Sequence, residues 1–571
     1  EMSRRKSVSP HDSLGSNLIV QVKNDSVKRV LPLENESLNE CWLSDKDRFS
    51  YEALNSDDRL TRPMVKQGGQ WIETDWQTAI DYVAKGLKAI RADHGVESIG
   101  SLASPHCTLE ELYLLQSITR GLGSGNIDFR LRQSDFSGDG KLSGAPWLGM
   151  AVSDISTLDR LFIVGSFFRK DHPLMAQRVR QSIKKGLKLS VLNPAFDDWQ
   201  LSIENKICVA PIEMVAGLAR IIKAVADETN QAISCDFVDL CAQVSVDDES
   251  LAVARSLASG RRSAIWLGNY AVQHKNAAQI HALSQEIARL VNCAFGVIGE
   301  AANSVGGYLA GAVPFGRIEG KNAVQMLSTP LKAYILAGVE PDLDIADGVS
   351  AVKSLREAEM VAALTVFKSQ SLLDLADVLL PIAPFTETAG VFVNCEGRAQ
   401  AFHPVTKSVG DSRAGWKVLR VIGTALELDG FDFGTIEEVR SKVLGDSLAV
   451  DSLKLGNSLA IDKFGLPEAV SGIQRIADIP IYSADPIVRR SGPLQATRDA
   501  DAPNARMSGS LISKIGLTPG ETVRIKSETG EVTVVLIEDD AVAAGCLRLA
   551  GGHGDTMSLG GLHGEVSVEC V

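Results

Sequence analysis

The residues best suited to chemistry lie in one polar stretch, TETAGVFVNCEGRAQAF at positions 386–402. It combines one cysteine and one arginine with acidic and amide side chains, and it follows the apolar run LADVLLPIAPF, which has the composition of a buried strand. Ligands bind beyond the carboxyl ends of strands in parallel sheets, so polar side chains are expected there. The stretch is therefore the first candidate for a site, whether working or lost.

The nine cysteines restrict the redox chemistry that this chain can carry. They are odd in number and scattered, and no two of them form a CxxC pair. This distribution favours a reducing compartment with mostly buried free thiols. It disfavours a disulfide framework and a local zinc or iron–sulfur knuckle.

Sequence motifs of common catalytic sites are missing. The chain has no GxSxG elbow, no P-loop and no HExxH. His106 and Cys107 are neighbours, but adjacent side chains seldom face each other, so we expect no catalytic dyad there. We expect His274 and His281 to be surface or half-buried groups rather than metal ligands.

Length and charge exclude several classes of function. A chain of 571 residues predicts three or four packed units, and no apolar run reaches the roughly 18 residues of a membrane span. The formal charge of -13 argues against nucleic-acid binding, which normally needs a basic surface. Glu1 is not an initiator methionine, so we expect a missing N-terminal part that holds cofactors or targeting signals.

Short apolar runs alternate with helical patterns through most of the chain. Strands are predicted at SIGSLAS, DRLFIVGS, LKLSVLNP, SAIWLGNYAV, LKAYILAGVEP and MVAALTVF, with amphipathic helices between most of them. This order indicates at least two doubly wound parallel sheets, each covered on both faces. Glycine or asparagine ends several strands, but none opens a full GxGxxG, so a dinucleotide fingerprint is absent.

The two ends of the chain depart from this alternation. NLIVQVKND and SVKRVLPL, with the turn-forming Asn24 and Asp25 between them, predict a β-hairpin. The next helix is predicted to begin with a capping box formed by Thr74 and Gln77. After about residue 475, alternating strands with regularly spaced turns predict a small β-barrel.

These features together resemble the molybdopterin oxidoreductase superfamily, including the terminal barrel that begins DPIVRRSGPLQAT. Four segments in order are more narrowly similar to the large iron–sulfur subunit of NADH:quinone oxidoreductase, respiratory complex I (the 75 kDa type). They are NECWLSDKDRFSYEALNSDDRLTRPM, NIDFRLRQSDF, GVIGEAANSVGGYLAG and EGRAQAFHPV. The resemblance covers essentially the whole chain.

The resemblance implies an α/β fold of the formate dehydrogenase or DMSO reductase type, with doubly wound parallel-sheet domains. Its expected first part is a β-rich segment at 1–65 that resembles the Fe4S4 domain of these enzymes. An α/β region at 66–475 follows, made of two interleaved subdomains, about 66–150 plus 315–475 and 151–314. A C-terminal barrel at 476–571 would resemble the molybdopterin dinucleotide-binding domain.

Many members of this family carry a four-cysteine iron–sulfur motif near the start of this region. In the present chain the four ligand positions fall on Ser9, Asp12, Ser16 and Ser44. Thiolates are the usual ligands of such clusters, and three hydroxyls with one carboxylate should not hold a [4Fe-4S] centre stably. We predict that no cluster binds at these positions.

The resemblance also indicates where a molybdenum ligand would stand. Formate dehydrogenase-like relatives place it at the position that matches Ser134, where Arg130, Arg132 and Asp135 would crowd the metal with charge. We expect no metal, no bound pterin and no catalytic residue, and we expect the two arginines to pair with carboxylates in a cleft filled by side chains. The residues expected to line this vestigial pterin cleft are Ser134, Asn394, Glu396, Arg398 and Gln400.

The leading interpretation is a cofactor-free scaffold in an enzyme that passes electrons from NADH through FMN and iron–sulfur clusters to quinone, coupled to proton translocation. The resemblance places [2Fe-2S] and [4Fe-4S] clusters in an N-terminal part outside this sequence. It implies other peripheral-arm subunits as partners, including the flavin- and NADH-binding subunit. The expected location is the cytoplasmic side of a bacterial inner membrane, or the matrix side in a mitochondrion.

Two alternatives stay open. A self-sufficient molybdenum or tungsten oxidoreductase of the formate dehydrogenase type predicts bound metal and a polar funnel that ends at Ser134. A free-standing adaptor unrelated to respiration predicts a gene that begins near Glu1.

Overall fold

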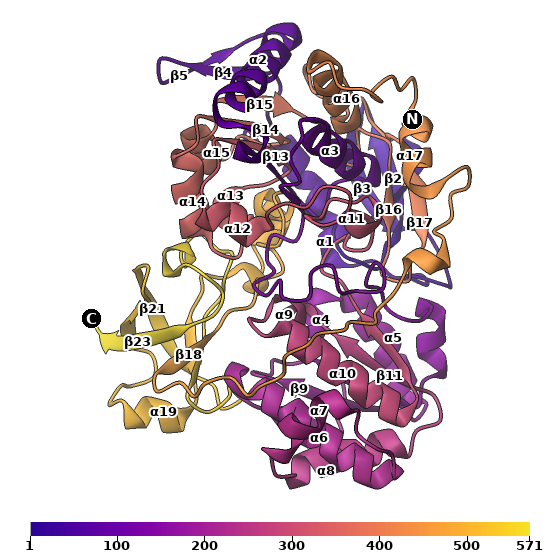
Figure 1. Cartoon of the computed structure of the whole chain (residues 1–571), viewed down its shortest axis with the longest axis vertical. Helices are drawn as coiled ribbons and strands as arrows, with labels where there is room; N and C mark the ends of the chain where they lie inside the picture. Colours follow the sequence, from indigo (N-terminus) through magenta and orange to yellow (C-terminus); the bar gives the residue numbers. More distant parts are fainter. Residues whose placement is uncertain (1) are drawn as a thin grey trace. The chain divides into compact units, whose positions relative to one another are not determined.

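Two parallel-stranded sheets organise the chain, each in its own compact unit (Figure 1). The computed structural model describes residues 2–571, and Glu1, on which the expectation of a missing N-terminal part rests, lies outside them. Unit 1 comprises Glu1–Arg132, Ala301–Lys454 and Tyr482–Asp501. Unit 2 comprises Gln133–Glu300, Leu455–Ile481 and Ala502–Val571.

Unit 1 is built on a seven-stranded sheet with the order β5-β4-β15-β14-β13-β6-β7. The strands from β15 to β7 are parallel, whereas β4 pairs antiparallel with both β15 and β5. Every residue of β6, β13, β14 and β15 is buried, as expected for a sheet covered on both faces. The strands are β4 (Met64–Gln67), β5 (Gln70–Glu73), β6 (Ile99–Ala103), β7 (Ile127–Asp128), β13 (Ala333–Ala337), β14 (Met360–Thr365) and β15 (Val378–Pro381).

Two groups of helices flank this sheet (Figure 1). One group contains α2 (Trp76–His94), α3 (Leu109–Gly121), α16 (Gly415–Ala425) and α17 (Ile436–Leu444). The other contains α12 (Ala323–Ser328), α13 (Pro341–Asp344), α14 (Gly348–Arg356) and α15 (Gln370–Leu375). Two shorter helices, α11 (Gly306–Leu309) and α18 (Gly492–Gln495), also belong to unit 1.

The start of helix α2 differs from the sequence-based prediction. Its N-cap is Asp75, whose carboxylate accepts from the backbone N–H of Thr78 at 2.8 Å. The predicted capping box of Thr74 and Gln77 is therefore wrong by one residue. Both residue types suit an N-cap, and aspartate is slightly the better of the two, in agreement with the structure.

A three-stranded antiparallel sheet opens the chain, with β1 (Ser3–Val8), β2 (Asn17–Lys23) and β3 (Ser26–Pro32). Asn24 and Asp25 both have positive φ angles in the β2–β3 turn, which confirms the predicted hairpin. Helix α1 (Asp45–Phe49) follows, and the β16–β17 hairpin (Gly390–Val393 and Ala399–Phe402) contributes to the same apolar core.

Unit 2 contains a second, fully parallel sheet with the order β10-β9-β8-β11-β12. Its strands are β8 (Arg160–Val164), β9 (Lys188–Asn193), β10 (Asn205–Cys208), β11 (Ser263–Leu267) and β12 (Ala294–Val297). Its helices are α4 (Phe168–Asp171), α5 (Pro173–Lys184), α6 (Met214–Thr229), α7 (Cys235–Ala242), α8 (Asp248–Ala258), α9 (Asn269–Gln273) and α10 (Ala277–Val291). The predicted alternation of strands and helices is confirmed.

The histidines of unit 2 correct one expectation. His274 and His281 are both buried, and each ring Nε2 lies within hydrogen-bond distance of a backbone carbonyl oxygen. Burial lowers the pKa of His281 to about 4, so its ring is neutral near pH 7. These side chains are therefore core groups rather than surface groups.

The C-terminal segment forms the predicted β-barrel, closed in the order β18-β22-β19-β21-β20-β23. Its elements are β18 (Ile473–Ile476), β19 (Ala505–Met507), α19 (Gly509–Lys514), β20 (Thr522–Lys526), β21 (Glu531–Glu538), β22 (Cys546–Arg548) and β23 (Glu565–Cys570). The finer division of the chain at residues 65, 150, 314 and 475 is kept as a proposal.

The nine cysteines are free thiols, as predicted, but they are not mostly buried. Four are buried, one is intermediate, and the four exposed ones are Cys41, Cys208, Cys235 and Cys570. Among residues 2–571, no helix has the length and apolar character needed to cross a membrane.

Candidate functional site

The four positions that match the iron–sulfur ligands are all buried. Ser9, Asp12 and Ser16 lie in the β1–β2 loop, and Ser44 stands directly before α1. The loop closes on itself, because the Ser9 N–H donates to the Ser16 carbonyl at 2.9 Å. Three hydroxyls and one carboxylate thus lie in the region where this type of domain would need thiolates.

Three of these oxygen groups already have local partners. Ser9 Oγ accepts from the His11 N–H at 3.2 Å, and Asp12 Oδ1 accepts from the Leu14 N–H at 3.0 Å. Ser44 Oγ caps α1 by accepting from the Asp47 N–H, and it donates to Asp47 Oδ2 at 3.0 Å. These groups therefore hold the fold of the loop and the helix end, and that they stand at lost ligand positions stays a prediction.

A buried charge pair stands beside this loop. His11 Nδ1 lies 2.8 Å from Asp485 Oδ2, and His11 Nε2 lies 2.7 Å from Ser50 Oγ. Burial alone would lower the pKa of His11, but the Asp485 carboxylate raises it above the ordinary value. Burial would raise the pKa of Asp485, but His11 holds it well below the usual range. The pair is therefore mainly an imidazolium and a carboxylate between about pH 4 and pH 6.5.

The order Ser50, His11, Asp485 has the connectivity of a nucleophilic triad, but its surroundings do not suit that chemistry. Ser50 is fully buried and does not line the neighbouring cavity described below, so a substrate carbonyl would have no path to its hydroxyl. A base that is already protonated cannot take the serine proton. The arrangement therefore works as a structural ion pair.

Asp47 links the former ligand positions to this pair. Burial raises its pKa to about 6, although the charge of His11 and hydrogen bonds from Ser9 and Ser44 act in the opposite direction. The group is thus partly protonated just below neutral pH. Asp47 and His11 are thus two titratable groups buried beside this loop.

The polar hairpin 386–402 packs against the same loop. Asn394 Nδ2 donates to the Leu14 carbonyl at 2.9 Å, and Gln400 Nε2 donates to the Gly15 carbonyl at 2.8 Å. The Cys395 N–H donates to the Ser13 carbonyl at 2.7 Å. Burial also raises the pKa of the Cys395 thiol strongly, so it is not an ionised nucleophile.

The other predicted cleft residues lie apart from an apolar cavity of unit 1. Glu396 and Arg398 form an ion pair, and the Arg398 guanidinium also donates to Ser37 Oγ at 3.0 Å. Ser134 is half-buried and belongs to unit 2. Neither these residues nor Asn394 and Gln400 line that cavity, so their role in a pterin cleft stays a prediction.

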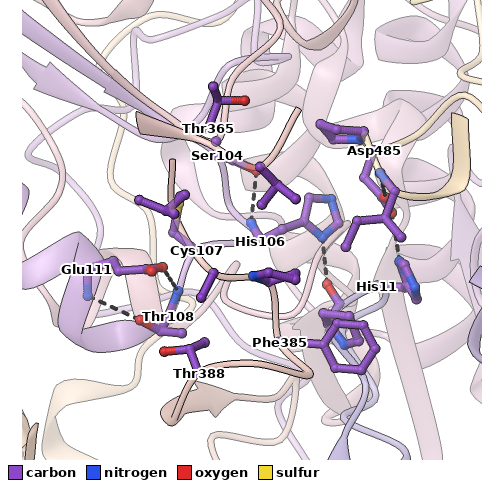
Figure 2. Close-up of a pocket in the computed structure, with 18 of the residues that line it drawn as sticks. His11, Ser104, His106, Cys107, Thr108, Glu111, Thr365, Phe385, Thr388 and Asp485 are labelled. Carbon is purple, nitrogen blue, oxygen red and sulfur yellow. Dashed lines mark hydrogen bonds and ion pairs between the residues drawn. The ribbon is translucent and has the colours of Figure 1, made fainter. Parts of the chain in front are cut away.

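That cavity lies at the carboxyl ends of β6, β13, β14 and β15, where ligands bind in doubly wound sheets. Figure 2 shows its lining, with His106, Cys107 and Thr108 from the loop after β6 and Thr365 at the end of β14. Its volume is about 100 Å³, and carbon atoms form most of its wall. His11 and Asp485 form one part of this wall.

His106 and Cys107 both line the cavity without forming a dyad. His106 Nδ1 lies 2.8 Å from the Pro10 carbonyl oxygen, and Cys107 Sγ donates to the Ala337 carbonyl at 3.4 Å. Burial raises the pKa of Cys107 well above its ordinary value, so the thiol stays protonated. The expectation that these neighbours form no catalytic dyad stays a prediction.

The arginines near the end of β7 pair with carboxylates, as predicted. Arg130 binds Asp128 through two hydrogen bonds of 2.8 and 2.9 Å, and Arg132 lies 3.5 Å from Asp344. A further arginine that no sequence motif singles out, Arg489, binds Asp344 and Glu340, each at 2.9 Å. Buried ion pairs between side chains of the protein therefore lie near the carboxyl edge of the sheet.

Sequence reasoning missed the most tightly coupled groups of this region. His11 and Asp485 are 474 residues apart, and no spacing rule connects them. A usable signal was the position of His11 itself, between two former ligand positions, where a charged residue needs a buried partner. Among residues 2–571, no group of three or more His, Cys, Asp or Glu side chains could hold a metal ion.

Comparison with family models matches two parts of the chain. Residues 59–425 match the molybdopterin oxidoreductase model. Residues 2–52 match the 4Fe-4S domain of the NADH-ubiquinone oxidoreductase NDSU1/NuoG-like type. The second match contains the four positions without cysteine.

Individual relatives agree with these matches at low identity. The G subunit of the NADH-quinone oxidoreductase of Rickettsia felis is 24% identical over 483 residues, which cover 82% of this chain and 62% of that protein. The alpha subunit of the F420-dependent formate dehydrogenase of Methanocaldococcus jannaschii is 23% identical over 76% of this chain and 72% of that protein. The chain thus spans about three fifths of the length of the Rickettsia felis relative.

A solved structure supports the fold. Acetylene hydratase from Pelobacter acetylenicus superposes with a TM-score of 0.74 over 99% of both chains, at 15% sequence identity. At that identity the match concerns the fold alone.

Proposed function

This chain belongs to the molybdopterin oxidoreductase family, and we propose that it is a cofactor-free scaffold within the large iron–sulfur subunit of an NADH:quinone oxidoreductase. The observation that carries the proposal is the state of the four former ligand positions. They offer oxygen instead of sulfur, and Ser9, Asp12 and Ser44 are bound to the protein itself. The similarity to the NADH-quinone oxidoreductase subunits of two Rickettsia species supports the identity of the complex.

The residues present do not fit a [4Fe-4S] cluster. Such clusters are held by thiolates, and a hard oxygen set with one carboxylate is a poor substitute for soft iron–sulfur chemistry. A cluster would also have to displace the cap that Ser44 places on α1 and the turn that Ser9 holds. We therefore derive no electron-transfer step through this domain.

The whole subunit would act in electron transfer through parts beyond this chain. The family resemblance implies [2Fe-2S] and [4Fe-4S] clusters in an N-terminal ferredoxin-like part, on the route from FMN to quinone. The present segment would support that part and contact other peripheral-arm subunits, among them the flavin- and NADH-binding subunit. Its place would be the cytoplasmic side of a bacterial inner membrane or the matrix side in a mitochondrion.

Metal analysis tests this proposal directly. The chain is produced in cells supplied with iron, molybdenum and tungsten, purified without oxygen, and analysed by mass spectrometry for each metal. We expect far less than one atom of each metal per chain. Iron in stoichiometric amount would overturn the cluster-free proposal, and molybdenum or tungsten would overturn the scaffold.

A variant with restored cysteines supplies the matched control. Ser9→Cys, Asp12→Cys, Ser16→Cys and Ser44→Cys together recreate the ligand set of the family. After anaerobic reconstitution we expect about four iron atoms per variant chain and broad absorbance near 400 nm, and neither in the native chain. Equal iron uptake by both proteins would show that the native oxygen ligands suffice, contrary to our argument.

The competing function is a self-sufficient molybdenum or tungsten oxidoreductase. It is favoured by the similarity to a formate dehydrogenase alpha subunit and by the serine at position 134, because serine can ligate molybdenum. Against it stands the charged carboxylate of Asp135, the residue after Ser134. This carboxylate is held in place by the protein, because it accepts from the Ala278 N–H at 2.9 Å and from Ser137. The same metal analysis separates the two proposals.

A further inference from the structure

The cavity of unit 1 has the position of a ligand site but not the lining of a polar one. It lies beyond the carboxyl ends of β6, β13, β14 and β15, the usual binding edge of a doubly wound sheet. Its apolar wall is made of Phe367, Ile382, Phe385, Phe392, Phe402 and Ile487. Phe392 and Phe402 are stacked with their ring centres 4.8 Å apart, so this wall is rigid.

Three polar groups of the wall, Thr365, Thr388 and Cys107, have their hydrogens committed elsewhere. Thr365 Oγ1 donates to the Phe367 carbonyl at 2.7 Å, and Thr388 Oγ1 donates to the Ala389 carbonyl at 3.1 Å. The Cys107 thiol donates to the Ala337 carbonyl. A polar ligand would therefore lose its hydrogen bonds to water without equal replacement.

Two of the ionisable groups at the wall compensate each other, and a third is neutral below about pH 7. His11 and Asp485 neutralise each other as an ion pair at 2.8 Å. Glu111 closes the capping box of α3, where its carboxylate accepts from the Thr108 N–H, and burial raises its pKa to about 7. An anion would find no free positive charge in this lining, and a cation would find only the Glu111 carboxyl, which is mostly protonated at pH 6.

We propose that this cavity binds a small, neutral, apolar molecule no larger than about one six-membered ring. The volume of about 100 Å³ sets the size, because engineered apolar cavities of about 150 Å³ stay dry and bind benzene or xenon. A water molecule needs two to four polar partners, and carbon atoms form most of this wall, so bound water is disfavoured. The inference does not depend on the proposed scaffold function.

Binding is tested on the full chain with benzene and xenon as probes. Saturable binding is measured by titration calorimetry for benzene and by the chemical shift of dissolved xenon. Benzoate and benzylamine serve as charged probes of the same ring size. We expect saturable binding of the neutral probes and at least tenfold weaker binding of both charged ones. No saturation by either neutral probe up to its solubility limit, or equal binding of a charged one, overturns the proposal.

Two substitutions place the probe in this cavity. Ala383 lines the cavity, so Ala383→Leu fills part of it and should weaken benzene binding at least tenfold. Ala376 is equally buried in the same unit but lies outside the cavity lining, so Ala376→Leu should leave the affinity within twofold. Phe385→Leu enlarges the cavity and should admit toluene. If Ala383→Leu fails to fold, the toluene measurement decides. A toluene affinity of Phe385→Leu equal to that of the native chain would contradict binding in this cavity.

Discussion

Replacing Asp485 by asparagine should destabilise the chain through a single lost charge. Asparagine keeps the shape of the side chain, and its oxygen can still accept from the N–H groups of Ile487 and Val488, as Asp485 Oδ1 does at 2.9 and 3.0 Å. Only the attraction to the His11 imidazolium disappears. Both side chains are at least nine-tenths buried, so water cannot replace the lost partner.

The magnitude follows from the cost of a buried unpaired ion. Removing one partner of a buried ion pair costs about 3–5 kcal/mol. His11 can release its proton once the carboxylate has gone, which limits the loss to about 2–3 kcal/mol at pH 6. The matched control is Asp58→Asn, because the Asp58 carboxylate is 53% exposed and pairs with Arg490 at 2.9 Å. A surface pair of that kind contributes less than about 1 kcal/mol.

The pH dependence identifies the charge. The pKa of His11 is raised above 6.5, so its contribution is complete below pH 6.5 and is lost as the pH rises through the raised value. The pKa of Asp485 is lowered below 3.8, so its contribution is present above pH 3.8. The difference in opening free energy between the native chain and Asp485→Asn should therefore be largest between pH 4 and 6.5 and should shrink towards pH 9.5.

Native-state hydrogen exchange is the suitable assay, because a chain with two units need not unfold in one step. Mass spectrometry of peptides from β1, β2 and β3 reports the opening free energy around His11 at pH 6 and 9.5. A loss in Asp485→Asn that is the same at both pH values, or no larger than that of Asp58→Asn, would refute the ion pair.

Three further substitutions test other buried groups. Glu111→Gln should leave the stability unchanged at pH 4.5 and should stabilise the chain by up to roughly 3 kcal/mol above pH 7. The reason is that burial raises the pKa of Glu111 from 4.5 to about 7, so ionisation of this side chain above pH 7 destabilises the folded state. Thermal unfolding at pH 4.5 and pH 8 measures the difference. Arg489→Ala should cost about 1–3 kcal/mol of protection against hydrogen exchange in unit 1, because buried Glu340 and Asp344 lose one of their guanidinium partners and keep only Arg490 and Arg132; no measurable loss would contradict the network. Gln400→Ala should lower the protection of residues 9–17 against hydrogen exchange by about 1–3 kcal/mol. The protection of peptides from unit 2 should stay unchanged.

Local patterns in the sequence predicted much of the fold. The buried strands β6, β13 and β14 carry nearly continuous apolar runs, and the β2–β3 turn carries Asn24 and Asp25. Each of these signals is complete within ten residues or so, which is why a single sequence reveals it. Exact helix ends were less certain, because Thr74 and Asp75 both suit an N-cap.

The partners of buried charges could not be predicted in the same way. Arg59 binds Glu387 through two hydrogen bonds of 2.9 Å across 328 residues, and His11 binds Asp485 across 474. Such pairs depend on how distant segments meet, and sequence spacing carries no information about that meeting. What the sequence does indicate is the need for a partner, since a charged residue in an apolar neighbourhood must be compensated.

The polarity of the hairpin 386–402 has a physical explanation that does not require a bound cofactor. The β1–β2 loop is buried, and buried carbonyl groups need donors. Asn394, Cys395 and Gln400 supply three, to the carbonyls of residues 14, 13 and 15. Hydrogen bonds from this hairpin thus hold the loop, and we expect its fold to survive without iron. A hairpin of apolar residues would keep the backbone donor of residue 395 but would lose the side-chain donors of Asn394 and Gln400. The Leu14 carbonyl would then be unsatisfied at about 1–3 kcal/mol, so stability alone gives a reason to keep these two positions polar.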